Sequence, residues 1–417
     1  MVSGFLNRQH ANRLMLEQGL SALVLAQPES ITYAAGAFPG VATNWRRAGA
    51  AFLVVPCDAS MPLTAIVGDL QADTFKAYSK IADVRSHPIW VETGRYDNDS
   101  DPENVVRSLV ENDMAMGKLP RQPRPAQYDP QASLGLLRDA LAERVLLNQR
   151  IGLEMGFVAA RDLAMFTNSM PKVSWMDATH IVERLRAIKA PQEIAYLRTA
   201  AELSRAGMAT LTQTITPGMD ADQMTAIWRA AALAEAHSKN LPPPASTWAY
   251  IAVGGDGFAP GGPVRTGDLI KIDVGCVIEG YSSDGGRTAV LGRAGRAAQQ
   301  VCDALHKSFD AGLALLKPGV ALNDVYRAVA TTMWDAGFTT YVRGHFGHGV
   351  GASIWSEEWP FISADATVAA EPGMVLAYET PYYIKGLGGF IIEDQILITE
   401  NGVEVMAASP RDLIEII

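Results

Sequence analysis

Two stretches of this chain each place a pair of carboxylates on the two sides of a turn. The pairs are Asp273 with Asp284, around residues 278–280, and Glu379 with Glu393, around Gly386. Residues at equal distances from a hairpin turn lie opposite each other, with side chains roughly 5 Å apart. Both pairs stand among apolar residues, and buried like charges need protons or a cation. The pattern therefore predicts a metal site on two β-hairpins.

Composition and charge narrow the class of protein. Nearly half of the 417 residues are hydrophobic, which provides a large core, and the net charge of −10 argues against a nucleic-acid partner. The first residues lack an apolar signal region, and no stretch approaches the roughly 20 apolar residues of a membrane span. Cys57, Cys276 and Cys302 have no metal-type spacing, which fits a reducing compartment. These features predict a soluble cytoplasmic protein.

The length of the chain suggests two domains. The apolar strands expected in the first part are 22–26, 50–55 and 63–67. They alternate with helical stretches, which indicates an α/β layer. A helical region begins near Asp177, and Pro191 suits the first position of a second helix. We expect an α+β protein with domains over 1–172 and 173–417; one continuous domain with a long connecting helix is the alternative.

A weak internal repeat occupies the second part. Residues 214–220 and 315–320 each carry a Pro-Gly turn that leads into a helix, and each precedes one of the carboxylate hairpins. Two related halves, each with a helix pair and a hairpin, would then contribute to one shared site.

A fifth ligand is suggested by His348, which lies in the glycine-rich segment 344–351. Glycines beside a histidine permit close approach of the backbone and unusual torsions. Taken singly, a glycine-flanked histidine is more often a loop residue, and a lone aspartate is more often a turn or cap residue. The coincidence of two mirrored acid pairs with this histidine favours a metal centre.

Four carboxylates and one imidazole form an oxygen-rich ligand set that suits Mn²⁺, Fe²⁺, Co²⁺ or Zn²⁺. Four negative charges exceed the charge of one divalent ion. Two bridged ions are therefore expected, with manganese favoured and cobalt, zinc or iron as alternatives. A water held between two such ions ionises near neutral pH and acts as a nucleophile.

The motifs around these residues resemble those of the pita-bread metallohydrolases, the family of Xaa-Pro dipeptidases (prolidases), aminopeptidase P, methionine aminopeptidase and creatinase. The matching segments are 266–275, 281–288, 347–351, 371–379 and 388–394, with residues 17–36 similar to the start of a creatinase-type N-terminal domain. The resemblance covers nearly the whole chain. It implies a creatinase-type α/β N-terminal domain, a pita-bread catalytic domain and a homodimer.

The resemblance also implies a role for each ligand. Asp273 would chelate one metal. Asp284 and Glu393 would bridge both metals, while the other metal would be completed by His348 and Glu379. As a general acid–base group, Glu379 would also relay the proton of the bridging water. The presence of all five ligands distinguishes the chain from creatinase, whose branch has lost the metal.

Three positions depart from the peptidase pattern. Trp355 stands where the peptidases carry a histidine seven positions after the ligand histidine. The peptidases also carry a histidine upstream of the first aspartate, and residues 253–262 of this chain contain no histidine. Ile391 stands where prolidases usually have an arginine. His345 is a candidate catalytic residue that could recover part of a lost role; alternatively it only supports the ligands or lies on the surface.

Aromatic residues near the ligands suggest a substrate pocket. They are Trp355, Trp359, Tyr382 and Tyr383. Such a pocket would favour an apolar or quaternary cationic group, and packing without a binding role is the alternative.

The favoured function is a dinuclear hydrolase of the Xaa-Pro dipeptidase type, which cleaves a C–N bond in a dipeptide through a metal-bridging hydroxide. The departures leave a second function open on the same metal site, either hydrolysis of a small non-peptide amide or lyase chemistry on dimethylsulfoniopropionate. A non-catalytic binding protein is the third hypothesis, and the paired acids argue against it.

Overall fold

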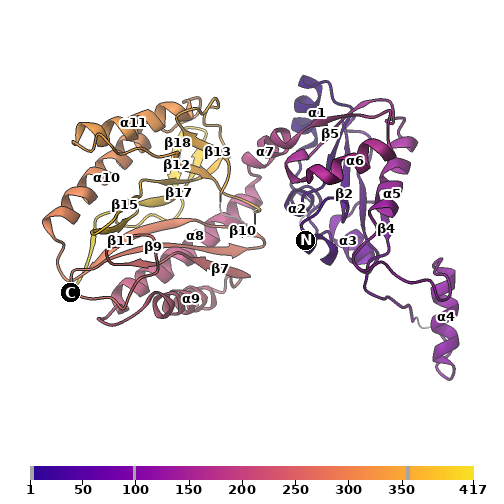
Figure 1. Ribbon diagram of the computed structural model, residues 1–417, viewed down its shortest axis with the longest axis horizontal. Coiled ribbons are helices and arrows are strands. Elements are labelled where there is room, and N and C mark those ends of the chain that lie inside the picture. The colour runs from indigo at the N-terminus through magenta and orange to yellow at the C-terminus, as the bar shows by residue number, and fades with distance from the viewer. Residues whose placement is uncertain (1–3, 97–99, 354–356) are drawn as a thin grey trace. The chain divides into compact units, whose positions relative to one another are not determined.

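The computed structural model describes residues 4–96, 100–353 and 357–417 (Figure 1). The chain divides into two compact units, one ending at Leu185 and the other beginning at Arg186. The sequence placed the boundary near residue 172. The first unit continues beyond that point because the strand Ser174–Asp177 pairs with the strand Arg150–Leu153 and so completes its sheet.

The first unit is built on a six-stranded mixed sheet with the order β4-β3-β2-β1-β5-β6. Its strands are β1 (Ala22–Leu25), β2 (Phe52–Pro56), β3 (Thr64–Gly68), β4 (Asp83–His87), β5 (Arg150–Leu153) and β6 (Ser174–Asp177). Its α-helices are α1 (Arg8–Glu17), α2 (Pro28–Ala35), α3 (Ala72–Ser79), α4 (Val105–Ala115), α5 (Pro130–Glu143) and α6 (Ala160–Ser169), and α7 (Thr179–Ala187) runs across the boundary. Alternate residues of β1 and β2 enter two separate cores, so both faces of the sheet are covered. This confirms the α/β layer expected from the sequence.

The second unit contains an eleven-stranded sheet whose main path is β10-β9-β11-β17-β14-β12-β13. The strands of this path are β9 (Leu269–Ile278), β10 (Tyr281–Ser282), β11 (Gly285–Leu291), β12 (His345–Gly349), β13 (Glu358–Ser363), β14 (Val375–Glu379) and β17 (Glu393–Thr399). Attached to it are β7 (Ser246–Ala249), β8 (Ala252–Val253), β18 (Gly402–Val405) and β19 (Ile414–Ile416), while β15 (Tyr382–Ile384) and β16 (Gly388–Phe390) form a separate ribbon. The helices are α8 (Pro191–Thr214), α9 (Ala221–Ser238), α10 (Arg296–Leu315) and α11 (Leu322–Asp335).

Two helix pairs pack on this sheet, and Figure 1 shows the strands between them. α8 and α9 share a core with Ile270 and Ile272 of β9, and α10 and α11 share one with Tyr378 of β14. Each pair is joined by a Pro-Gly turn whose glycine has a left-handed φ, 92° at Gly218 and 84° at Gly319. The structure thus contains the repeat of helix pair and hairpin that the sequence predicted.

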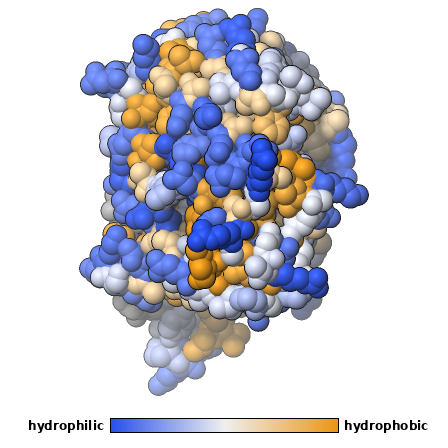
Figure 2. Space-filling view, turned by 90° about the vertical axis from the view of Figure 1, so that its left-hand side faces the viewer, coloured by the Kyte–Doolittle hydropathy of each residue, from blue (hydrophilic) through white to orange (hydrophobic). Residues whose placement is uncertain are grey.

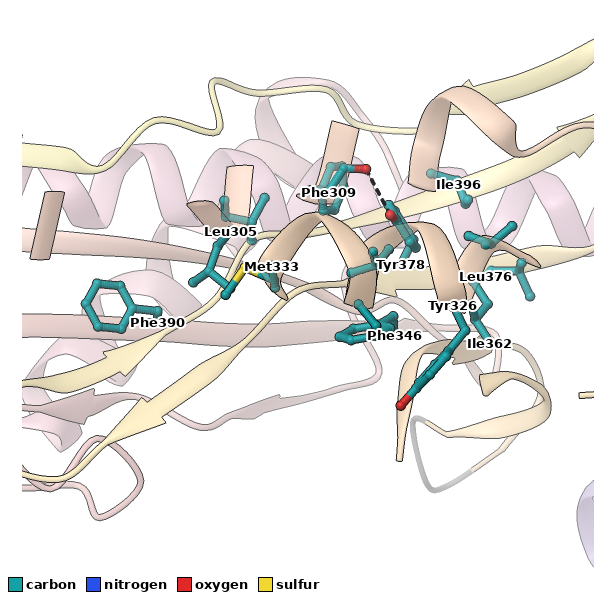
Figure 3. Close-up of a cluster of buried hydrophobic side chains, with 14 of the residues drawn as sticks. Leu305, Phe309, Tyr326, Met333, Phe346, Ile362, Leu376, Tyr378, Phe390 and Ile396 are labelled. Carbon is teal, nitrogen blue, oxygen red and sulfur yellow. Dashed lines mark hydrogen bonds between the residues drawn. The ribbon is translucent and has the colours of Figure 1, made fainter. Parts of the chain in front are cut away.

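The core beneath α10 and α11 fixes the position of β14 (Figure 3). The rings of Phe309 and Tyr378 lie 4.4 Å apart between centroids, and the Tyr378 hydroxyl donates a 2.8 Å hydrogen bond to the Phe309 carbonyl oxygen. Gly312 leaves room for this ring, since a Cβ there would lie 2.1 Å from the Tyr378 hydroxyl. Because side chains alternate along a strand, Tyr378 on the helix side directs Glu379 to the other face.

One face of the second unit carries mainly polar side chains. Figure 2 shows this face, where hydrophilic side chains predominate and smaller hydrophobic areas lie between them. Among the residues that the structure describes, no helix combines the length and apolar character needed to cross a membrane.

Glu193 ties the first turn of α8 to the hairpin of β9 and β10. Its Oε2 accepts a 2.7 Å hydrogen bond from the Ala190 amide, and its Oε1 accepts a 2.8 Å bond from the Tyr281 hydroxyl. The side chain is buried, with Lys189 and Glu358 as charged neighbours. Burial raises the pKa of Glu193 to about 7.

Replacing this residue, as Glu193→Gln, is expected to remove part of the pH dependence of the free energy of unfolding. An acid with a raised folded-state pKa binds more protons when folded, so stability falls as pH rises from 4.5, the ordinary value, to about 7. The loss amounts to at most roughly 3 kcal/mol. The free energy of unfolding of the glutamine variant should equal that of wild type below pH 4.5 and should exceed it above about pH 7. Urea unfolding on both sides of the window measures the difference, and a difference that does not change with pH contradicts the assignment.

Candidate metal centre

Three carboxylates and a glycine form a row across the second sheet. Asp273 on β9 pairs with Gly286 on β11. On its other side Gly286 pairs with Glu393 on β17, which in turn pairs with Glu379 on β14. Residues paired across strands project to the same face, so the three carboxylates share the face opposite Tyr378 and the helices. Gly286 contributes no side chain, which leaves space between Asp273 and Glu393.

The two hairpins differ in how well their register was predicted. Glu379 and Glu393 are direct partners, as expected. In the first hairpin a two-residue turn at 279–280, with both residues at positive φ, joins β9 to β10. The direct opposition predicted for Asp273 and Asp284 was therefore wrong by two residues. Because the side-chain period of a strand is two, such a shift leaves both carboxylates on one face.

Asp284, His348 and Glu393 form a compact buried trio, with one ligand atom from each lying within 4.8 Å of the others. The Nδ1 of His348 lies 3.0 Å from the Gly349 carbonyl oxygen, which can only accept a hydrogen bond. Nδ1 therefore carries the proton of the neutral ring. The other nitrogen, Nε2, presents its lone pair 3.5 Å from Oδ2 of Asp284. This is how a metal-binding histidine is held by its surroundings.

Two oxygens of this trio lack a hydrogen-bond partner among the described residues, Oδ1 of Asp284 and Oε2 of Glu393, and both are buried. Burial, together with the neighbouring carboxylates, raises the pKa values of Asp284 and Glu393 well above their ordinary range. A buried acceptor without a partner is destabilising by about 1–3 kcal/mol. A divalent cation would satisfy both oxygens and favour the ionised carboxylates, so the residues present fit a metal.

The two outer carboxylates of the row each face a cation. Lys271 places Nζ 2.8 Å from Oδ2 of Asp273, and Arg343 places Nη2 2.8 Å from Oε1 of Glu379. Burial acts to lower the pKa of Lys271, but Asp273 and other acids raise it, and the net shift is upward. Two metal ions were expected from the negative charge of four carboxylates, and Lys271 and Arg343 already neutralise part of that charge.

The sequence analysis missed both cations. Lys271 lies two residues before Asp273 on one strand, so alternation alone places the two on the same face. It was overlooked because it stands within an apolar run. Arg343 lies in the loop before β12, and only the tertiary fold brings it to Glu379.

Glu379 and His345 form the edge of the site beside Arg343. Burial raises the pKa of Glu379 to about 7, although Arg343 acts to lower it. The Nδ1 of His345 lies 3.6 Å from Oε1 of Glu379 and has no hydrogen-bond partner within the described parts of the chain. Burial, with Arg343 and His348 nearby, lowers the pKa of His345 to about 4, so this ring is neutral at pH 7. The structure thus brings the two predicted catalytic residues together.

The three described aromatic residues of the predicted pocket, Trp359, Tyr382 and Tyr383, do not gather in one place. Trp355 lies outside the described residues. Trp359 and Tyr382 pack against the core beneath α10 and α11, and the Tyr382 ring meets Tyr341 at 4.9 Å. Only Tyr383 is seen at the carboxylates, with its ring centroid 5.4 Å from Lys271 Nζ. Neighbouring residues of a strand point to opposite faces, so Tyr382 and Tyr383 could not both line one pocket, and that part of the prediction was wrong.

Residues 253–262, which lack the histidine found in the peptidases, lie beside Tyr383. Phe258 lies 5.7 Å from Tyr383 in an edge-to-face arrangement. Ile391, in the place of the usual prolidase arginine, is buried, and a Cβ on Gly286 would lie 2.8 Å from it. An apolar side chain therefore fills the space near the row where the resemblance predicts a cation.

A separate ion-pair network holds β17 from the opposite face. Arg287 Nη2 lies 2.6 Å from Oδ1 of Asp394, and Arg411 Nε lies 2.7 Å from Oδ2. The Nη1 of Arg287 also donates a 2.7 Å hydrogen bond to the carbonyl oxygen of Glu393. These contacts position the backbone of Glu393 without using its carboxylate.

Comparison with known proteins agrees with this architecture. Residues 195–400 match the model of metallopeptidase family M24, and residues 8–188 match that of the creatinase/prolidase N-terminal domain. An Xaa-Pro dipeptidase from Pyrococcus furiosus is 30% identical over 240 residues, which span 56% of this chain and 67% of that protein. The chain belongs to metallopeptidase family M24.

Particular relatives and solved structures extend the comparison. The uncharacterized peptidase YqhT of Bacillus subtilis is 27% identical over 272 residues, which span 64% of this chain and 75% of that protein. The structure of an Xaa-Pro dipeptidase from Bacillus anthracis superposes with a TM-score of 0.76 at 19% identity, covering 98% of both chains. The N-terminal domain of the FACT complex subunit SPT16 from chickpea superposes with a TM-score of 0.68 at 15% identity, covering 97% of this chain and 96% of that one. The fold is thus found both in an Xaa-Pro dipeptidase and in a domain of a FACT complex subunit. Because the fold alone does not identify the function, the function has to be argued from the site.

Proposed function

We propose that this chain is a metal-dependent hydrolase of the Xaa-Pro dipeptidase type, which cleaves the C–N bond of a dipeptide or a similar small substrate. The observation that carries the proposal is the buried trio of Asp284, His348 and Glu393, with two unpaired carboxylate oxygens and a histidine lone pair in one place. Asp273 and Glu379 lie in the same row and complete the proposed ligand set. The relatives named as Xaa-Pro dipeptidases support the substrate class.

The ligand set of oxygens and one imidazole suits manganese, with cobalt, zinc or iron as alternatives. When bound, a divalent ion supplies polarisation of a carbonyl group and a water of lowered pKa. A homodimer and a cytoplasmic location also belong to this proposal.

Proton transfer is assigned to Glu379. Its Oε1 is held by Arg343, which leaves Oε2 to take up and release a proton. In the metal-free chain burial raises the pKa of this carboxylate above its ordinary value, which favours the uptake of a proton. The neutral His345 beside it can donate or accept a hydrogen bond at Nδ1, according to its tautomer, without bringing another charge into the site.

A second function, hydrolysis of a small non-peptide amide or a lyase reaction of the dimethylsulfoniopropionate type on the same metal, is favoured by one specific observation. Ile391 is buried where the resemblance predicts a substrate-binding arginine. A dipeptide substrate without that cation has lost one partner for its carboxylate.

Turnover of a panel of Xaa-Pro dipeptides with added Mn²⁺ separates the two. We expect release of proline from at least one dipeptide, and loss of that release in the matched Asp284→Ala variant, which excludes a contaminating peptidase. A panel that is inert while the protein holds metal contradicts the dipeptidase assignment and favours the second function.

A further inference from the structure

Lys271 is an unusual residue for the floor of a metal site. It lies on β9 between Thr288 on β11 and Ala252 on β8, and it is only 3% exposed. Lysine is almost never buried to this extent unless its charge is paired. Its partner is Asp273, at 2.8 Å, and the Tyr383 ring lies 5.4 Å from its Nζ.

The charges around the row balance with a single divalent ion. The four proposed carboxylate ligands carry four negative charges, and Lys271 and Arg343 carry two positive charges within hydrogen-bond distance of two of those carboxylates. Two negative charges remain, and they fall on Asp284 and Glu393, whose oxygens are the unpaired ones. One divalent ion neutralises them, whereas a second would leave the buried site with excess positive charge.

The two cations differ in how easily they can leave. The Arg343 side chain is 21% exposed and precedes a strand, so it can turn toward solvent and release Glu379 to an ion. Lys271 extends from the middle of a buried strand and is nearly without solvent contact. Moving its Nζ away from Asp273 would leave a buried ammonium without its carboxylate, which is strongly unfavourable.

We infer that the ammonium of Lys271 takes the place of the second metal ion beside Asp273, so that the chain binds one divalent ion tightly, at Asp284, His348 and Glu393. The inference rests on the proposed function, because it assumes that these residues hold a catalytic metal. It replaces the pair of ions expected from the carboxylates alone. Asp273 then serves to hold Lys271, whose charge lies where a second ion would otherwise lie.

Metal stoichiometry tests this inference directly. The metal-free wild-type chain and a Lys271→Met variant are titrated with MnCl₂, and bound ions are counted by native mass spectrometry. We expect one ion in wild type and two in the variant, since methionine keeps the length of the side chain and removes its charge. Lys271→Arg is the matched control, and retention of charge should keep it at one ion. Electron paramagnetic resonance gives a second readout, the spectrum of an isolated Mn²⁺ in wild type and of a coupled pair in Lys271→Met.

The outcomes separate the inference from the function on which it rests. Two tightly bound ions in the wild type overturn the inference and leave the metal-dependent hydrolase intact. A single ion in a folded Lys271→Met variant also overturns it, because the lysine then does not exclude the second ion. No bound ion in wild type overturns the proposed function as well. If Lys271→Met does not fold, the wild-type count alone still decides.

Discussion

Replacing Asp284 by asparagine is expected to remove tight metal binding and to make the metal-free chain more stable. The substitution removes a buried carboxylate whose Oδ1 has no partner among the described residues and whose charge is opposed by burial and by the nearby acids Asp273 and Glu379. The asparagine amide can instead donate a hydrogen bond to Nε2 of His348, which now lies 3.5 Å from the carboxylate. Relief of the unpaired acceptor should raise the free energy of unfolding by about 1–3 kcal/mol.

The same change should lower Mn²⁺ affinity by more than about 100-fold, because loss of a residue that merely supports a ligand already lowers it 10–100-fold. Calorimetric titration with MnCl₂ measures the affinity, and thermal unfolding with and without the ion measures the stability. The expected pattern is a variant that is more stable than wild type without metal and is no longer stabilised by adding it. Wild-type affinity in Asp284→Asn would contradict the ligand assignment.

Replacing Asp394, the next residue after the proposed ligand Glu393, should make the chain less stable. Asp394 is buried and pairs with both Arg287 and Arg411. An Asp394→Ala substitution leaves the buried Arg287 without its carboxylate, and breaking a buried pair in this way costs about 3–5 kcal/mol. We expect a large loss in the free energy of unfolding, measured by denaturant titration.

The number of ions bound by the folded Asp394→Ala chain should not change, because this carboxylate points away from the row. Arg411→Met is the matched control. It leaves Asp394 with its pair to Arg287, so a smaller loss of stability is expected. A cost below about 1 kcal/mol for Asp394→Ala would show that Arg287 is satisfied by its other acceptors, at Ser409, Pro410 and the Glu393 carbonyl.

The shared face of the carboxylates could be predicted from the sequence for a simple physical reason. A strand has a side-chain period of two, so its face assignments survive an error of two residues in register. The hairpin with Asp273 and Asp284 had such an error, because the actual turn is the pair 279–280. The helix pairs could also be predicted from the sequence, because Pro191 and the two Pro-Gly turns mark the ends of the helices.

The features that were not predicted from the sequence depend on contacts between residues far apart in the chain. Arg343 reaches Glu379 only after β12 and β14 have paired. The aromatic pocket was predicted from residue type alone. Side chains alternate along a strand, so Tyr382 points to the core and Tyr383 points toward Lys271. The strand that carries the first unit past residue 172 is short, and only its pairing with β5 identifies it.

The row of carboxylates has a consequence for how this chain assembles. Its three carboxylates come from three different strands, and the contact from the Asp284 amide to Gln395 joins positions 111 residues apart. Closing a loop of that length has an entropic cost that must be met before the carboxylates can meet. The site therefore has no precursor in the unfolded chain, and a metal ion can join only a nearly finished sheet. The apparent affinity of this row for a metal ion is accordingly its intrinsic affinity multiplied by the fraction of chains whose second unit is folded.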